Sequence, residues 1–225
     1  MKGRIFIVAL LLVFVCVPIM AQTNKAQIKE QRELKKQKRK SLDEKSSKTA
    51  RKEAKKLEKE GWLVIPGKLP LDKQLERSYL MAEEYDDYGY PKFIVGSASS
   101  IGENYDAAKL QAMELAKLEL AGLMESEIAA LTDNTISNEQ LSPEQAASIA
   151  KSVTASKSKI AQSFGRVITV IEMYRVVSSN KNKEVTVTIA YNHELALEAT
   201  KKIIRKDLEE RGDELHKELD KIVGW

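Results

Sequence analysis

The sequence has 225 residues, of which 43% are hydrophobic and 31% are charged, with 10 glycines and 5 prolines. This composition excludes a collagen-like chain, a low-complexity chain and a protein with several membrane spans. One cysteine and two histidines exclude a disulfide scaffold and argue against a structural zinc site, which usually takes about four Cys or His ligands.

Residues 1–21 have the pattern of a secretory signal peptide. Lys2 and Arg4 give a positive start, and an uninterrupted apolar run follows over residues 5–17. Ala21 supplies a small residue at the cleavage position, so the mature chain is predicted to begin at Gln22. We therefore expect an exported protein, located in the periplasm or on the periplasmic face of the outer membrane.

Two alternatives for this segment stay open. The first is an uncleaved membrane anchor, although the apolar run is shorter than the ~20 residues of a membrane span. The basic residues that follow it favour this alternative, because positive charge after an apolar segment resists translocation. The second is lipidation of Cys16, although the bulky Val15 before it fits a lipoprotein signal poorly.

Residues 22–60 form a basic arm, with 15 Lys/Arg against 7 Asp/Glu, whereas residues 61–225 hold 20 Lys/Arg against 26 Asp/Glu. The arm contains no Pro or Gly and few apolar residues, so we expect a solvated helix or a disordered segment. It is either a spacer or a binding arm for an anionic membrane or cell-wall surface. No aromatic residue is interleaved for base stacking, so nucleic acid is not an expected partner. The candidate surface contacts are Lys35, Lys36, Lys38, Arg39, Lys40, Lys55 and Lys56.

Residues 61–225 are predicted to form one domain. A short strand is expected at 62–65, a helix at 71–85, a loop at 86–91 and a strand at 93–98. The long helix predicted at 103–131 has a stripe of large apolar residues, which suits a sheet, and a stripe of small ones, which suits close packing against another helix.

The second half of the domain is predicted from clearer signals. Ser142, Pro143 and Gln145 form a capping box with proline at the first helical position, so a helix should run from there to about residue 162. Strands at 167–177 and 185–191 form a hairpin, in which the threonines of the second strand should face outward. A helix over 192–222, with Gly212 as a possible kink, completes an α+β fold with a mainly antiparallel sheet.

Several of these features together resemble a known family. Val95-Gly96-Ser97-Ala98 precedes a helix with Ala108, Ala112 and Ala116, and a further helix, Gly165 and two strands follow. This order over residues 92–192 resembles the twenty-kilodalton lipoprotein family of Gram-negative envelopes, to which the N-terminal domain of a flagellar-assembly outer-membrane protein is also similar. The resemblance implies an α+β domain in the cell envelope without known catalysis, and it implies no catalytic residues here. The C-terminal helix over 193–225 lies outside it.

No catalytic motif accompanies this organisation. His193 and His216 are predicted to be separate surface residues, and no glycine-rich phosphate loop is present. We therefore expect a non-enzymatic interaction module with no cofactor, no metal and no small-molecule substrate, bound to a surface or to an envelope protein. A self-assembling scaffold subunit is the alternative. A carboxylate-based glycan hydrolase is a third hypothesis, and it requires a cleft with two facing carboxylates.

Overall fold

The structure is a computed structural model that describes residues 32–33, 45–87, 89–137, 141–179, 181–217 and 219. The chain divides into two compact units, Met1–Lys45 and Ser46–Trp225. In the first unit, the described residues are Arg32 and Glu33, which are helical, and Lys45. All of the architecture that follows belongs to the second unit.

This second unit begins earlier than the predicted end of the arm at residue 60. Helix α3 (Lys48–Lys59) belongs to it, and Ala50 and Ala54 on this helix are buried. The prediction of a solvated arm over the whole of 22–60 is therefore wrong for this stretch. Two alanines four residues apart lie on one helix face, and this small apolar face is enough to pack α3 against its neighbour.

Three antiparallel strands form the sheet: β1 (Phe93–Gly102), β2 (Ile168–Val176) and β3 (Lys183–Asn192), in the order β1-β3-β2. β2 and β3 form the predicted hairpin, and β1 pairs with β3 along its whole length. The predicted α+β class is confirmed. The strand predicted at 62–65 is wrong, because only Leu63 pairs there, with Tyr174 at the outer edge of β2, before the chain turns at Pro66.

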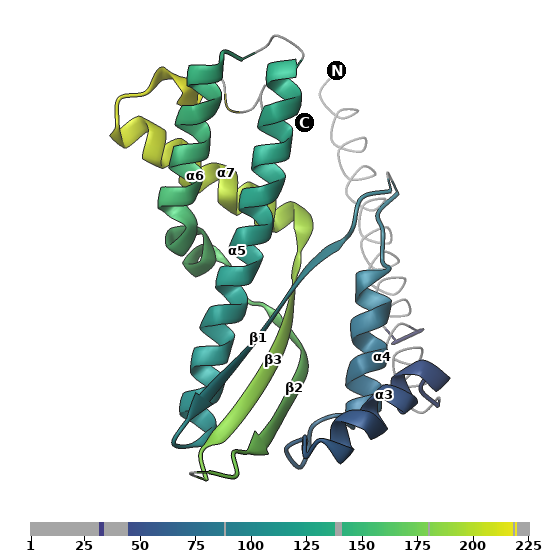
Figure 1. Ribbon diagram of the computed structural model, residues 1–225. Coiled ribbons are helices and arrows are strands. Elements are labelled where there is room, and N and C mark those ends of the chain that lie inside the picture. Colours follow the sequence, from purple (N-terminus) through teal and green to yellow (C-terminus); the bar gives the residue numbers. More distant parts are fainter. Residues whose placement is uncertain are drawn as a thin grey trace, which may run out of the picture. The chain divides into compact units, whose positions relative to one another are not determined.

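One face of the sheet is covered by α5 (Tyr105–Ser137), with α6 (Pro143–Ser163) and α7 (His193–Glu210) on the same side (Figure 1). Residues of both stripes of α5 contact the sheet, the small Ala108 next to Gly102 and the large Leu120 next to Gly96. Ala108, Ala112 and Ala116 are fully buried, and a Cβ added at Gly96 of β1 would lie 2.6 Å from the Ala116 carbonyl oxygen. The predicted roles of the two stripes are thus only partly right, since Leu120 contacts β1 and Gly122 faces Lys157 of α6 as expected, whereas Ala108 also lies against the sheet. Where backbone is in close contact with backbone, only small residues fit.

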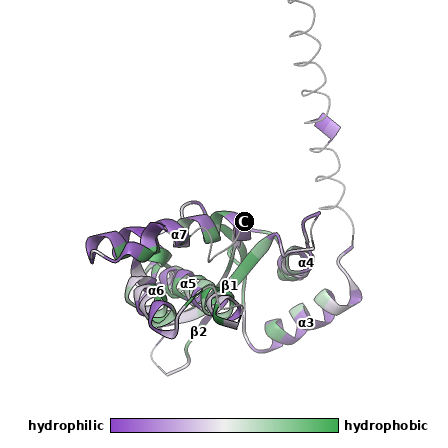
Figure 2. Ribbon diagram, turned by 90° about the horizontal axis from the view of Figure 1, so that it is seen from above, coloured by the Kyte–Doolittle hydropathy of each residue, from purple (hydrophilic) through white to green (hydrophobic). Residues whose placement is uncertain are grey.

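The opposite face is covered by α4 (Leu71–Ala82), against which α3 packs (Figures 1 and 2). Leu71, Leu75 and Met81 form a second apolar core with residues of β2 and β3. The prediction that the β3 threonines face solvent is only partly right. Thr188 is buried, and its hydroxyl lies 2.9 Å from that of Ser97 on β1. A sheet with helices on both faces leaves few strand positions exposed.

The start of α6 has the predicted capping box. The Ser142 hydroxyl accepts a hydrogen bond from the Gln145 backbone N–H, and the Gln145 side chain accepts one from the Ser142 N–H. Ser142→Ala should therefore lower the free energy of unfolding by about 1 kcal/mol. Urea denaturation checks this, with the exposed Ser158→Ala in the same helix as the control. Equal stability of the two variants would contradict a contribution from the cap.

The C-terminal helix is divided as its glycine suggested. α7 ends at Glu210, Gly212 adopts φ 69°, and the 3₁₀ helix η1 (Glu214–Lys217) follows. A left-handed residue favours glycine and stops an α-helix. Hydroxyls of α6 fix the turn, since Ser148 donates to the Asp213 carboxylate at 2.5 Å and Ser152 donates to that of Asp207 at 2.6 Å.

Candidate anionic-surface interface

Helix α3 is held firmly against α4 by polar contacts as well as by its two alanines. The Ser47 side chain caps the helix and accepts from the Ala50 N–H at 3.2 Å, while the Ser47 N–H donates to Glu76 of α4 at 3.1 Å. The Tyr79 hydroxyl donates to Glu53 in the middle of α3. Burial and this hydrogen bond raise the pKa of Tyr79 to about 12, so the phenol keeps its proton at any physiological pH.

A further contact secures the start of this segment, since the Ser46 hydroxyl donates to Asp72 at 2.7 Å. Three side chains of α4 therefore hold α3, two of them at the residues just before the helix and one at Glu53 in its middle. With its alanine face buried and Glu53 bound to Tyr79, α3 has a fixed rotation about its own axis. The side of α3 that remains in contact with solvent is consequently a fixed surface.

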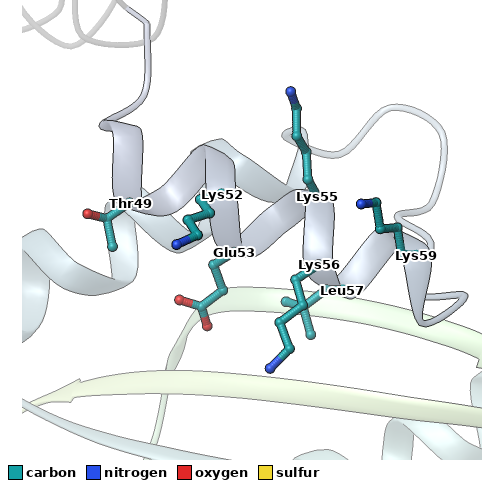
Figure 3. Close-up of a pocket in the computed structure, with 7 residues that line it drawn as sticks. All are labelled: Thr49, Lys52, Glu53, Lys55, Lys56, Leu57 and Lys59. Atoms are coloured by element: carbon teal, nitrogen blue, oxygen red, sulfur yellow. The ribbon is translucent and has the colours of Figure 1, made fainter.

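That solvent side carries six basic residues, all of them exposed. We call them the basic lattice: Lys48, Arg51, Lys52, Lys55, Lys56 and Lys59. At 3.6 residues per turn they occupy a continuous arc of about 140°, over a helix about 18 Å long. Figure 3 shows four of its lysines, and Figure 2 shows the mainly hydrophilic character of α3.

The lattice consists of two parallel rows with a spacing of four residues. One row is 48, 52 and 56, and the other is 51, 55 and 59, so every cation has a like charge one turn away. Within α3 the acidic residues are Glu53 and Glu58, both outside the arc. Each like-charge pair at this spacing destabilises a helix by about 0.2–0.5 kcal/mol. The arrangement therefore costs α3 some helix stability.

Ion pairing offsets little of this repulsion. Among the described residues, the one ion pair of the lattice is Lys56 with Glu60, at 4.0 Å and well exposed. The Arg51 guanidinium donates to the Ser47 carbonyl at 3.5 Å. In α7 the basic residues form one group over 201–206 with acidic residues on either side, and Lys206 pairs with Glu210 at 3.7 Å. The positive charge of the lattice is therefore directed at solvent.

The structure brings two of the predicted contacts, Lys55 and Lys56, into this lattice. The other predicted contacts, Lys35, Lys36, Lys38, Arg39 and Lys40, lie outside the described residues, as do Ala21 and Gln22 at the predicted cleavage position. Sequence reasoning missed four members of the lattice: Lys48, Arg51, Lys52 and Lys59. The spacing of three and four residues between basic positions over 48–59, around two alanines, was the signal that could have found them.

Three carboxylates gather at the opposite end of the fold, where Glu144, Asp213 and Glu214 line a hollow. The backbone N–H of Glu144 and the Ser142 hydroxyl hold the pKa of Glu144 below its usual value. Hydrogen bonds from Ser148 and Leu215 do the same for the pKa of Asp213, and Lys217 does so for that of Glu214. A carboxylate-based glycan hydrolase needs one carboxyl group with a raised pKa as its acid, and none of these three carboxyl groups has a raised pKa.

The most deeply buried carboxylate is Glu172 on β2, with a side chain only 4% exposed. It accepts from the Tyr105 hydroxyl and from Lys109 at 2.9 Å, and Lys68 lies 3.5 Å away. Burial opposes ionisation, but these donors and charges outweigh it and hold the pKa of Glu172 below its usual value. Burial and the bond to Glu172 raise the pKa of Tyr105. All of these partners belong to the protein itself. Through them, Glu172 joins α5 and the segment before α4 to the sheet.

The two histidines also have partners within the protein. His193 begins α7 and is buried, contrary to the prediction of a surface residue, and its Nε2 lies 2.8 Å from the Glu127 carboxylate. His216 lies in η1, where its Nδ1 is 2.7 Å from the Asp213 carbonyl oxygen. Among the described residues, no group of three His, Cys, Asp or Glu could hold a metal ion.

None of the described helices has the length and apolar character needed to cross a bilayer. No model of a known protein family matches the chain, and neither a curated protein nor a solved structure matches it. The resemblance of residues 92–192 to envelope lipoproteins therefore stays a prediction.

Proposed function

We propose that this chain is a non-enzymatic protein of the cell envelope, whose α+β domain is an interaction module held near an anionic surface by basic residues. The observation that carries the proposal is the basic lattice, because six exposed cations, with one exposed ion pair among the described residues, form a positive field to which an external anion can bind. Clustered Lys and Arg near an anionic surface gain about 1 kcal/mol each.

The carboxylates support a binding role over a catalytic one. Those that line the hollow between α6 and η1 all have lowered pKa values, and Glu172 is occupied by donors of the protein itself. A general acid works best with a pKa near the working pH, and the lowered pKa values of these carboxyl groups do not favour that role. The alternative of a self-assembling subunit stays a prediction, which a monomer in light scattering at high concentration would contradict.

Binding to anionic surfaces is the test of this function. The full chain, with and without the predicted signal segment, is sedimented with anionic vesicles and with cell-wall fragments at low and high salt. We expect binding at low salt that falls steeply as the ionic strength rises, because exposed charges are screened within a Debye length of about 8 Å at physiological salt. Absence of binding to both surfaces, or binding unaffected by salt, would reject the proposal.

Deletion of residues 22–60, the simplest variant for such a test, is unsuitable. It would remove α3 and expose the second apolar core, since Ala50 and Ala54 are buried there with Leu75. A loss of binding in the deletion variant would then report unfolding as well as lost charge. Point substitutions in the solvent-facing arc of α3 avoid this problem.

A further inference from the structure

We infer that the basic lattice of α3 is a docking face for the phosphate groups of phospholipids with a net negative headgroup, and that it binds them at headgroup depth without insertion of the helix. This inference rests on the proposed function and names the partner of its basic surface. It follows from the arrangement of the charges, from the fixed rotation of α3 and from the place of Trp62.

The arrangement of the charges favours a two-dimensional array of phosphates. Two parallel rows of three cations, on an arc of about 140°, present charge along the helix and across it. A single linear polyanion would be matched by one row, whereas the headgroups of a bilayer lie in a plane and can contact both. α3 contains no aromatic residue on which a sugar or a base could stack.

The fixed rotation of α3 argues against insertion. An amphipathic helix enters a bilayer by placing its apolar face among the acyl chains. In this protein that face consists of Ala50, Ala54 and Leu57, and the two alanines are already buried in the second apolar core. Insertion would have to break the contacts of Glu53 and Ser47 with α4, and it would expose the core in exchange. Electrostatic contact through the lattice requires no such rearrangement.

Trp62 is a natural reporter of this rotation. It lies just beyond α3, its backbone N–H donates to the carbonyl of Leu57 in the last turn at 3.1 Å, and its side chain is 7% exposed. The Arg175 guanidinium lies 4.6 Å from its ring centroid. A roll of α3 into a membrane would pull Trp62 out of this site. Trp225→Phe leaves Trp62 as the single tryptophan.

The experiment uses the full chain with Trp225→Phe and vesicles of phosphatidylglycerol and phosphatidylcholine. The lattice variant is Lys52→Glu/Lys55→Glu/Lys59→Glu. The control is Lys151→Glu/Lys159→Glu/Lys202→Glu, which makes the same charge change at exposed positions of α6 and α7. We expect the lattice variant to bind at least about a hundredfold more weakly, since each cation near the surface contributes about a fivefold factor. The control should bind as the parent does, and neither should bind vesicles of phosphatidylcholine alone.

The lattice variant should stay folded, because three of the four like-charge pairs at a spacing of four residues, 48/52, 52/56 and 51/55, become opposite-charge pairs, and 55/59 stays a like-charge pair. Its thermal unfolding is measured alongside. Depth is read from the quenching of Trp62 by lipids brominated on their acyl chains, and we expect no quenching.

Three results would overturn the inference. Equal binding of the lattice variant and the parent would place the contact outside α3, and the proposed function would survive. Quenching of Trp62 by brominated chains would show insertion. Tighter binding to soluble poly(glycerol phosphate) or to duplex DNA than to vesicles, at equal phosphate concentration, would identify a linear polyanion as the partner.

Discussion

Gly96→Ala is expected to lower the free energy of unfolding by about 3 kcal/mol, the upper part of the range for overpacked cores. A Cβ at this position would lie 2.6 Å from the Ala116 carbonyl oxygen and 3.0 Å from Leu120 Cγ. The first of these atoms belongs to the backbone of α5, so it cannot move away without displacing the helix from the sheet. In a domain of this size the midpoint of thermal unfolding should fall by roughly 6–12 °C.

Gly165→Ala is the matched control, because a Cβ there has no atom within 4 Å and the residue lies just before β2. It should change the free energy of unfolding by less than about 0.5 kcal/mol. Gly102→Ala should resemble Gly96→Ala, since its Cβ would lie 2.9 Å from the Ala108 backbone nitrogen. If Gly96→Ala proved as stable as Gly165→Ala, α5 could not approach β1 as closely as described.

Local signals predicted the second half of the domain well. The capping box at Ser142, the β-branched hairpin and the helix break at Gly212 each depend on residues close in sequence, and each has a local physical cause. The class of the fold followed from the order of these elements. The orientation of α5 did not, because both of its stripes are apolar, and the close approach of the helix to Gly96 and Gly102 of β1 cannot be seen in the sequence of α5 alone.

The candidate site was predicted only in part. The excess of positive charge before residue 60 pointed to an interaction surface, but low hydrophobicity suggested an arm where α3 is in fact packed. Two alanines give a weak signal, and their burial depends on α4 partners, among them Glu76 and Tyr79, that lie about 25 residues further along the chain. Such contacts cannot be deduced from the composition of a segment. These contacts hold α3 against α4, and for that reason its cations form a fixed surface.

Nothing about the partners of Glu172 could be predicted, because an isolated glutamate within an apolar strand gives no signal of what it contacts. Its donors come from the start of α5 and from the loop before α4, and the Gln74 side chain accepts from the Glu172 backbone N–H at 2.7 Å. This contact caps a backbone group at the outer edge of β2, close to the bridge of Leu63 with Tyr174. Unpaired strand edges invite association with other strands. At this edge of β2, the backbone N–H and the side chain of Glu172 both have partners within the protein, which protects the edge.

Glu172→Gln should lower the free energy of unfolding by about 2 kcal/mol at pH 7, because it leaves Lys109 beside a neutral group in a largely buried site. The loss should be smaller than for a fully buried pair, because both lysine partners are partly exposed. The pKa of Glu172 is lowered in the folded state, so its stabilisation is complete above the unfolded pKa of about 4.3 and is lost as the pH falls through the folded value. The difference between the parent and the variant should therefore shrink below about pH 4. Urea unfolding at pH 7, 5 and 3.5 measures it, with Glu184→Gln as control. The Glu184 side chain is 20% exposed against 4% for Glu172, so loss of its pair with Arg175 at 2.7 Å should cost less than about 1 kcal/mol. A loss at Glu172 that equalled the control, or that stayed constant at low pH, would show that the buried carboxylate does not act through its charge.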